Sequence, residues 1–167
     1  MQDQESANTL PGGGEMRALH ETTTEHVPRF ASPAHKQGRG PQAPGRILLV
    51  EDDSSLASLE ADILTAYGYM VTVASSGEQA IAALQQATPD LIVLDLQLPG
   101  SVTGWDVLQN LRIHARTPVL LTSSDTAARA HLLTSGEARS TLDHLPKPYP
   151  MHVLLKRIER MLLIAPG

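Results

Sequence analysis

The chain has 167 residues, of which 41% are hydrophobic but only 3% aromatic, so it has room for one ordinary domain with an aliphatic core. It contains no cysteine, which excludes disulfides, zinc–thiolate sites and thiol nucleophiles. A formal net charge of −5 argues against nucleic acid as a direct partner, and the sequence has neither a membrane-length apolar run nor a signal sequence, so we expect a cytoplasmic protein.

Residues 1–45 differ from the rest of the chain. They hold half of the 12 glycines and show no sustained apolar period. Such a segment buries too little apolar surface to offset its chain entropy, so we predict a disordered extension or linker over 1–45 and a folded domain over 46–167. The PGGGE segment at 11–15 lacks a preceding strand and the ending of a phosphate loop. The wide spacing of His20, His26 and His35 makes a metal-binding tail a poor prediction.

From Arg46 onward, short apolar runs alternate with segments of helical period. The apolar runs predict strands at 46–50, 69–74, 91–95, 118–122 and 141–145, the last of which is weak. A first helix is expected from a cap at Asp53 or Ser54 to a stop at Gly68, because Leu56, Leu59, Ile63 and Leu64 recur at helical spacing. Further helices are expected at 77–86, 105–113, 126–133 and 151–164.

The first, third and fourth runs are continuously apolar, which is typical of strands that are buried on both faces. Strands that alternate with helices across short links favour a parallel sheet with helices on both sides. We therefore predict a doubly wound, flavodoxin-like α/β fold with five strands. The strand order 2-1-3-4-5 suits this length, although the pattern alone does not fix the order.

In such a sheet, ligands bind at the carboxyl ends of the strands, and here those ends carry polar side chains. Each residue by itself has an ordinary explanation, for example a helix cap at Asp53 or a turn at Asp95. Their combination on neighbouring strands favours a functional site. The residues are Glu51, Asp52 and Asp53 after the first strand, Asp95 at the end of the third, Thr122, Ser123 and Ser124 at the fourth, and Lys147 after the fifth.

Electrostatics narrows the role of this site. Two carboxylates about 5 Å apart repel by roughly 3 kcal/mol at an effective dielectric constant of about 20, so three of them need a shared proton or a cation at neutral pH. Oxygen ligands without cysteine or a nearby histidine point to a hard ion such as Mg²⁺. A bound Mg²⁺ and Lys147 would together neutralise a phosphoryl group, so these residues support phosphoryl transfer to a carboxylate.

Four segments together resemble the response-regulator receiver domain of two-component signalling, from Arg46 to about Ile164. They are ILLVEDD (47–53), DLQLPG (95–100), a hydroxyl after PVLL (118–121) and LPKP (145–148). The resemblance implies that Asp95 is the phosphoacceptor. It also implies that Glu51, Asp52, Asp95 and the backbone carbonyl of Gln97 bind Mg²⁺, with Asp52 the more direct ligand of the acidic pair. Lys147 would pair with the phosphoryl oxygens, and its bond to Pro148 would be cis.

The resemblance also implies partners. The phosphoryl donor would be a sensor histidine kinase or a histidine phosphotransfer protein, with Mg²⁺-dependent autophosphorylation and autodephosphorylation at Asp95 rather than conventional enzyme turnover. A downstream protein effector would bind or leave the face formed by the fourth helix, fifth strand and fifth helix, and a phosphorylation-dependent homodimer is one form of this output. Because no output domain follows Gly167, we expect a stand-alone receiver or one cut from a larger kinase.

Four features depart from the family's pattern. The turn LPGSVTG (98–104) is one residue longer than usual, and EARSTLDHLPKP (137–148) lacks the Gly-Ala that usually precedes the fifth strand. Counting from Pro118 favours Ser123 as the switch hydroxyl, whereas residue type favours Thr122, and we lean slightly to Ser123. His144 occupies the switch position where the family has Tyr or Phe. It is either a half-exposed strand residue or part of a modified, pH-sensitive switch.

Two other classes of function stay open at this point. A degenerate receiver would act as a protein-binding module without ever being phosphorylated. A metal-dependent enzyme of the TOPRIM type, such as a nuclease or ligase subunit, would need a second aspartate where Gln97 stands, which counts against it.

Overall fold

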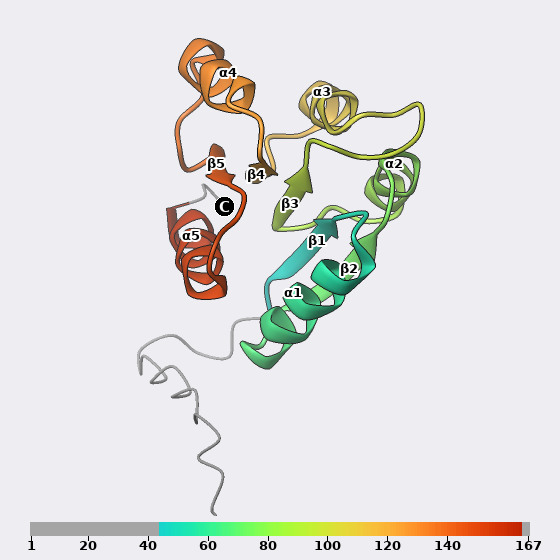
Figure 1. Ribbon diagram of the computed structural model, residues 1–167, viewed down its shortest axis with the longest axis vertical. Helices are drawn as coiled ribbons and strands as arrows, with labels where there is room; N and C mark the ends of the chain where they lie inside the picture. Colours follow the sequence, from blue (N-terminus) through green and yellow to red (C-terminus); the bar gives the residue numbers. More distant parts are fainter. Residues whose placement is uncertain (1–43, 165–167) are drawn as a thin grey trace, which may run out of the picture. The chain divides into compact units, whose positions relative to one another are not determined.

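The computed structural model describes residues 44–164, which form five strands and five helices in alternation (Figure 1). The strands are β1 (Arg46–Val50), β2 (Met70–Ala74), β3 (Leu91–Asp95), β4 (Val119–Ser123) and β5 (Leu142–Pro146). The helices are α1 (Ser54–Ala66), α2 (Gly77–Gln86), α3 (Gly104–His114), α4 (Ala127–Ser135) and α5 (Met151–Ile164). None of these helices is long and apolar enough to cross a membrane. The predictions for the PGGGE segment, for the three early histidines and for nearly all of the extension lie outside the described residues.

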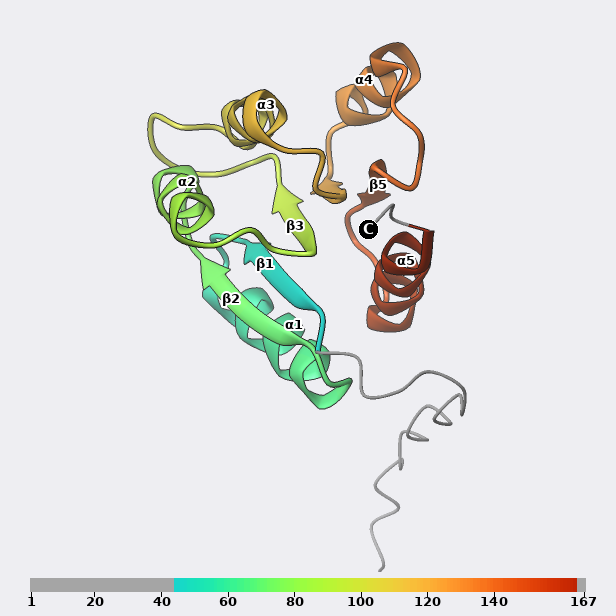
Figure 2. The same cartoon turned by 180° about the vertical axis from the view of Figure 1, so that it is seen from behind.

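The strands form one parallel sheet in the order β2-β1-β3-β4-β5, which confirms the predicted fold class and strand order. Figures 1 and 2 show β1 between β2 and β3, and it pairs with both of them in parallel register. The direction of winding reverses between β1 and β3. The carboxyl ends of these two strands therefore border the crevice at which such sheets bind their ligands.

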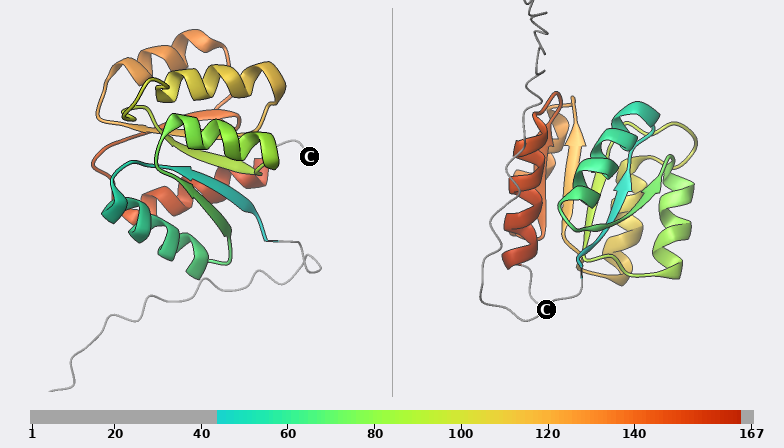
Figure 3. Two further views of the ribbon diagram at one scale, coloured as in Figure 1. Left: turned by 90° about the vertical axis from the view of Figure 1, so that its right-hand side faces the viewer. Right: turned by 90° about the horizontal axis from the view of Figure 1, so that it is seen from below.

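Helices cover both faces of the sheet, with α2, α3 and α4 on one side and α1 and α5 on the other (Figure 3). Side chains within a strand point alternately to the two sides, so each strand contributes to two separate cores. The core under α2, α3 and α4 contains Leu48, Ile92, Leu121, Val107 and Ala128 among others. The core under α1 and α5 contains Leu49, Val93, Leu120, Leu64 and Leu154 among others.

The helix α1 forms where the apolar spacing predicted it. Of the four apolar residues at that spacing, Leu64 is fully buried, Leu56 and Ile63 are half-buried, and Leu59 is 49% exposed. The buried side chains of α1 are Ala57, Glu60 and Leu64, which follow the same helical spacing. The apolar spacing therefore predicted the helix, but it gave no sign that a glutamate belongs to the buried stripe.

Several element boundaries differ from the predicted ones by one or two residues. β4 begins at Val119 because Pro118 has no N–H to donate to the ladder, although its carbonyl still accepts from the Ile92 amide (2.9 Å). β2 begins at Met70 because the Tyr69 amide donates to the Leu64 carbonyl at the end of α1 (3.1 Å). β5 also lies one residue later than predicted, and α4 continues to Ser135.

The long turn between β3 and α3 is held by neighbouring elements. Glu78 on α2 accepts hydrogen bonds from the Ser101 hydroxyl (3.0 Å) and the Val102 amide (3.3 Å). Gly104 then starts α3 directly against the end of β3, because a Cβ atom at Gly104 would lie only 2.4 Å from the Asp95 carbonyl oxygen. The glycine thus allows α3 to pack against the backbone of Asp95.

Candidate functional site

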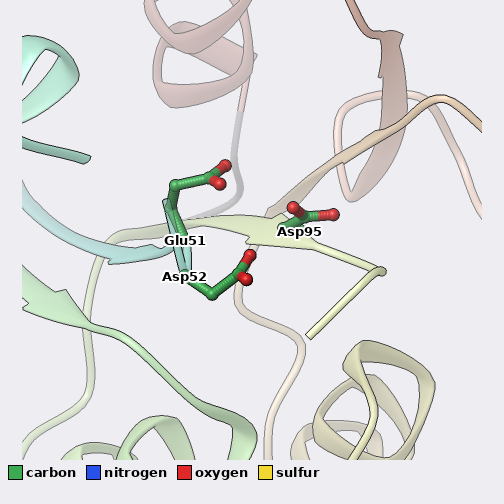
Figure 4. A group of neighbouring side chains, drawn as sticks. All are labelled: Glu51, Asp52 and Asp95. Carbon is green, nitrogen blue, oxygen red and sulfur yellow. The ribbon is translucent and has the colours of Figure 1, made fainter. Parts of the chain in front are cut away.

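Three carboxylates converge where β1 and β3 end. Glu51, Asp52 and Asp95 each offer an oxygen atom, and these atoms lie within 4.8 Å of one another (Figure 4). Glu51 and Asp95 are 2% and 3% exposed, whereas Asp52 is exposed to solvent. Because β1 and β3 are adjacent in the sheet, their pairing sets the separation of the carboxylates.

The fourth nearby acid, Asp53, has a different role. Its Oδ1 atom accepts hydrogen bonds from the amides of Ser55 (2.9 Å) and Leu56 (3.0 Å), so it caps the N-terminus of α1. This agrees with the explanation that the sequence favoured for Asp53.

Lys147 supplies the positive charge of the site. Its Nζ atom lies 2.6 Å from Asp95 Oδ2 and 2.7 Å from Glu51 Oε2, and its peptide bond to Pro148 is cis. Burial lowers the pKa of Lys147, but the hydrogen bonds to Asp95 and Glu51 outweigh this effect and raise the pKa overall, so the ammonium group stays charged. Burial raises the pKa of Glu51 above its ordinary value, although Lys147 opposes the shift.

The donor set fits a hard divalent cation. Three carboxylates face one ammonium group, so a negative charge remains when all of them are ionised. Buried like charges favour either a proton or a cation between them. Carboxylate oxygens are the ligands that Mg²⁺ and Ca²⁺ prefer, and the exposed Asp52 leaves the cluster accessible to solvent.

The Asp95 carboxylate is held at both of its oxygens. The Gln97 amide donates to Oδ1 (2.8 Å), while Lys147 donates to Oδ2 (2.6 Å). The side chain of Gln97 in turn accepts a hydrogen bond from the Ser124 hydroxyl (2.8 Å). The orientation of Asp95 is therefore fixed by the chain itself.

The two candidate switch hydroxyls at the end of β4 face opposite sides of the sheet. Thr122 is in register with Asp95 and shares the side of α1 and α5, where its buried hydroxyl has no hydrogen-bond partner within residues 44–164. Ser123 points to the side of α2, α3 and α4. Its oxygen accepts from the Asp125 amide (2.8 Å), which leaves its hydrogen available to donate.

His144 shares the sheet face of Ser123, because it is in register with Leu121 on β4. Its Nε2 atom is buried without a partner among the described residues. Burial lowers the pKa of His144, so the ring is mainly neutral at pH 7. It lines a groove of about 300 Å³ beside α4, together with Arg129 and Arg139.

Two polar clusters near the site were not predicted. Glu60 on α1 is buried and accepts a hydrogen bond from the hydroxyl of Tyr149 (2.6 Å). Asp143 on β5 is 1% exposed and forms ion pairs with Arg139, Arg157 and Arg160. The sequence holds a weak signal for both, namely an acid at a position where helical or strand spacing calls for an apolar side chain.

Comparison with known proteins agrees with this geometry. The response regulator receiver domain pattern matches residues 47–159. The chain is 34% identical over 117 residues to the DNA-binding response regulator MtrA of Mycolicibacterium paratuberculosis, covering 70% of this chain and 51% of MtrA. It is 38% identical to the transcriptional regulatory protein CpxR of Klebsiella pneumoniae, covering 70% of this chain and 49% of CpxR. The chain thus spans about half the length of these curated relatives.

A solved structure gives the same result for the fold. The receiver domain of the Francisella response regulator 1452 superposes with a TM-score of 0.63 at 27% identity, over 71% of this chain and 97% of that domain. The family pattern covers well over half of the chain, and the relatives exceed 30% identity over the same region. The chain therefore belongs to the response regulator receiver domain family.

Proposed function

We propose that the chain is a phosphorylation-dependent signalling switch in which Asp95 accepts the phosphoryl group. Membership of the receiver domain family supports the general role in two-component signalling. The observation that carries the specific assignment is the fixed Asp95 carboxylate, which the Gln97 amide and Lys147 orient inside an acidic cluster. Asp95 is also the acid on which β3 ends, so the sheet holds it rigidly.

The chemistry is a transfer of one phosphoryl group. An oxygen of Asp95 forms the bond to phosphorus, and the bond from phosphorus to the imidazole nitrogen of a histidine kinase or phosphotransfer protein breaks. Lys147 then pairs with the phosphoryl oxygens. Glu51, Asp52, Asp95 and the backbone carbonyl of Gln97 would hold Mg²⁺, which when bound supplies positive charge against the carboxylates and the phosphoryl oxygens.

The output would come from the face formed by α4, β5 and α5. A phosphoryl group adds a charge of about −1.5 to −2, which draws a hydroxyl and Lys147 inward and biases a two-state equilibrium. We favour Ser123 over Thr122 for this hydroxyl, because Ser123 shares the α4 side of the sheet with His144. A protein effector would then bind or leave this face.

The first experiment measures the intact mass of the full chain after incubation with acetyl phosphate, with and without Mg²⁺. We expect one phosphoryl adduct on the wild-type protein with Mg²⁺ and none on Asp95→Asn. Asp52→Asn should need more Mg²⁺ for the same extent of labelling. Asp53→Asn is the matched control, because Asp53 belongs to the same acidic run but caps α1, and an asparagine still caps a helix.

Labelling of Asp53→Asn at the wild-type level would show that the changes in Asp95→Asn and Asp52→Asn come from the loss of a residue of the carboxylate cluster, and not from the loss of any negative charge in this part of the chain. A folded wild-type protein that takes up no phosphoryl group would overturn the proposal and favour a receiver that acts only as a protein-binding module.

A further inference from the structure

Glu60 is a carboxyl side chain in the middle of a core. It is 0% exposed and belongs to the stripe of α1 that packs on the sheet, between Ala57 and Leu64. Burying a carboxyl group costs free energy that an apolar side chain of similar size would not. A purely structural position on this stripe would be better filled by leucine, so the contacts of Glu60 call for an explanation.

The contacts of Glu60 lead to one tyrosine. The Tyr149 hydroxyl donates to Glu60 Oε1 (2.6 Å), while Oε2 is buried and has no partner in the described part of the chain. Burial, and then the bond to Glu60, raise the pKa of Tyr149, and the nearby Thr122 hydroxyl opposes this shift. Tyr149 therefore stays protonated and acts as the donor. We call Glu60, Tyr149 and Thr122 the Glu60 cluster.

The Glu60 cluster adjoins the proposed phosphorylation site. Thr122 is in register with Asp95 on the adjacent strand, on the same side of the sheet. Tyr149 lies two residues after Lys147 in the segment between β5 and α5. That segment is held at two points: the Lys147 amide donates to the Ser123 carbonyl (3.0 Å), and Tyr149 donates to Glu60.

We propose that Glu60 is a positioning residue for phosphorylation: through Tyr149 it anchors the segment that carries Lys147, and its uncharged form favours the phosphorylated state of Asp95. This inference rests on the proposed function. The anchoring role follows from the hydrogen bond between Tyr149 and Glu60, which connects α1 to the segment after β5. That segment carries Lys147, whose ammonium group lies 2.6 Å from Asp95. The preference for uncharged Glu60 follows from electrostatic repulsion, because phosphorylation of Asp95 adds negative charge near the buried Glu60 carboxyl group.

The charges around Glu60 support the link. Burial raises the pKa of Glu60 to about 7; the bond from Tyr149 opposes the shift, Glu51 and Asp95 add to it, and Lys147 opposes it. These four groups come from three segments, namely the loop after β1, the end of β3 and the segment after β5. Because linkage is reciprocal, a proton on Glu60 favours added negative charge at Asp95 as much as that charge favours the proton.

The test compares the full-length wild-type protein with Glu60→Gln at pH 6, 7 and 8 under one saturating Mg²⁺ concentration. The readout is the initial rate of phosphoryl labelling by acetyl phosphate, and the rate of the variant is divided by the rate of the wild type at the same pH. Glutamine keeps the hydrogen-bond acceptor but cannot ionise. We expect the ratio of Glu60→Gln to wild type to be near one at pH 6 and to rise about tenfold by pH 8, the effect of about one pK unit of coupling.

Two further variants separate anchoring from charge. Tyr149→Phe removes only the hydroxyl, and we expect labelling to slow several-fold at every pH because one hydrogen bond is lost. Asp62→Asn, on the exposed side of the same helix, should follow the wild-type profile. Parallel wild-type and Glu60→Gln profiles would overturn the proposed charge link, and a wild-type rate in Tyr149→Phe would overturn the anchoring role.

A measurement without phosphorylation keeps the two proposals apart. The carboxyl carbon of Glu60 is titrated by ¹³C NMR in the wild-type protein and in Asp95→Asn. The inference expects a lower pKa of Glu60 in Asp95→Asn, because a negative charge that raises it has been removed. An unchanged pKa would overturn the inference even if labelling succeeds. Absence of labelling with a shifted pKa would overturn the proposed function alone.

Discussion

At Glu60, burial outweighs hydrogen bonding in setting the protonation state. Its pKa in the folded protein is about 7 against an ordinary value of 4.5. Between these two pH values the native state keeps a proton that the unfolded chain has released. The free energy of unfolding therefore falls as pH rises from about 4.5 to about 7, by up to about 3 kcal/mol, and this contribution stays level above pH 7. The folded protein should be measurably less stable in mild alkali for this reason.

Replacing Glu60 by glutamine tests this expectation. The variant lacks the ionisation, so its unfolding free energy relative to wild type should be about 2 kcal/mol more favourable at pH 8 than at pH 5. Urea titrations at the two pH values measure this difference. Asp62→Asn is the control, since an exposed acid contributes no comparable burial cost. An equal difference at both pH values would mean that Glu60 ionises normally in the folded protein.

Residues were predictable from the sequence when their role depended on a strand end, and unpredictable when it depended on a distant partner. The acids after β1 and at the end of β3 follow directly from the alternation of strands and helices. Tyr149 meets Glu60 across 89 positions in the chain, and no local pattern contains that contact. The ion pairs of Asp143 with arginines on α5 were missed for the same reason.

At the scale of elements, α3 packs very closely on the end of β3. A Cβ atom on Gly104 would lie 2.4 Å from the Asp95 carbonyl oxygen and 2.6 Å from Leu96 Cα. Both neighbours are backbone atoms at the end of β3, so α3 must move outward to relieve the clash. Because one of these atoms belongs to Asp95, the proposed phosphoacceptor, the packing of α3 and the position of Asp95 are coupled.

Gly104→Ala should therefore lower the free energy of unfolding by about 2 kcal/mol, the usual cost of overpacking. Thermal unfolding followed by circular dichroism measures the change. Gly45→Ala is the matched control, because its nearest contact would be Tyr69 Cδ1 at an ordinary 3.4 Å. If both variants melted at the wild-type temperature, α3 would pack less tightly on β3 than the structure indicates.

Element boundaries were less predictable than element types. Apolar runs identified every strand, but the ends of β2 and β4 depend on which amide has a partner. The Tyr69 amide is taken by α1, and Pro118 has no amide hydrogen. On α1, hydrophobic spacing predicted the helix correctly, but it gave no sign that the buried face of the helix includes Glu60.

At the scale of the molecule, the same sheet carries the acidic cluster on one side and the residues of the proposed output face on the other. Strand parity places Glu51, Asp95, Thr122 and Lys147 toward α1 and α5, while Ser123 and His144 face α4. A charge added at Asp95 would therefore lie on the side of α1 and α5, whereas Ser123 and His144 lie on the opposite side. The order of the strands creates this arrangement. The hydrophobic pattern alone did not fix that order, but the length of the domain suited the order that the structure confirms.

The boundary of the folded domain gives a last prediction. The sequence indicates a disordered extension over 1–45, and both cores found in the described residues are drawn from positions 47–162. A chain that starts at residue 44 should then keep the thermal midpoint of the full chain to within about 1 °C, and the same rate of labelling at Asp95. Starting at residue 51 instead deletes β1, an interior strand that pairs with both β2 and β3, and should abolish folding. A midpoint several degrees lower for the first truncation would correspond to about 1 kcal/mol of lost contacts, and would show that the extension packs on the domain.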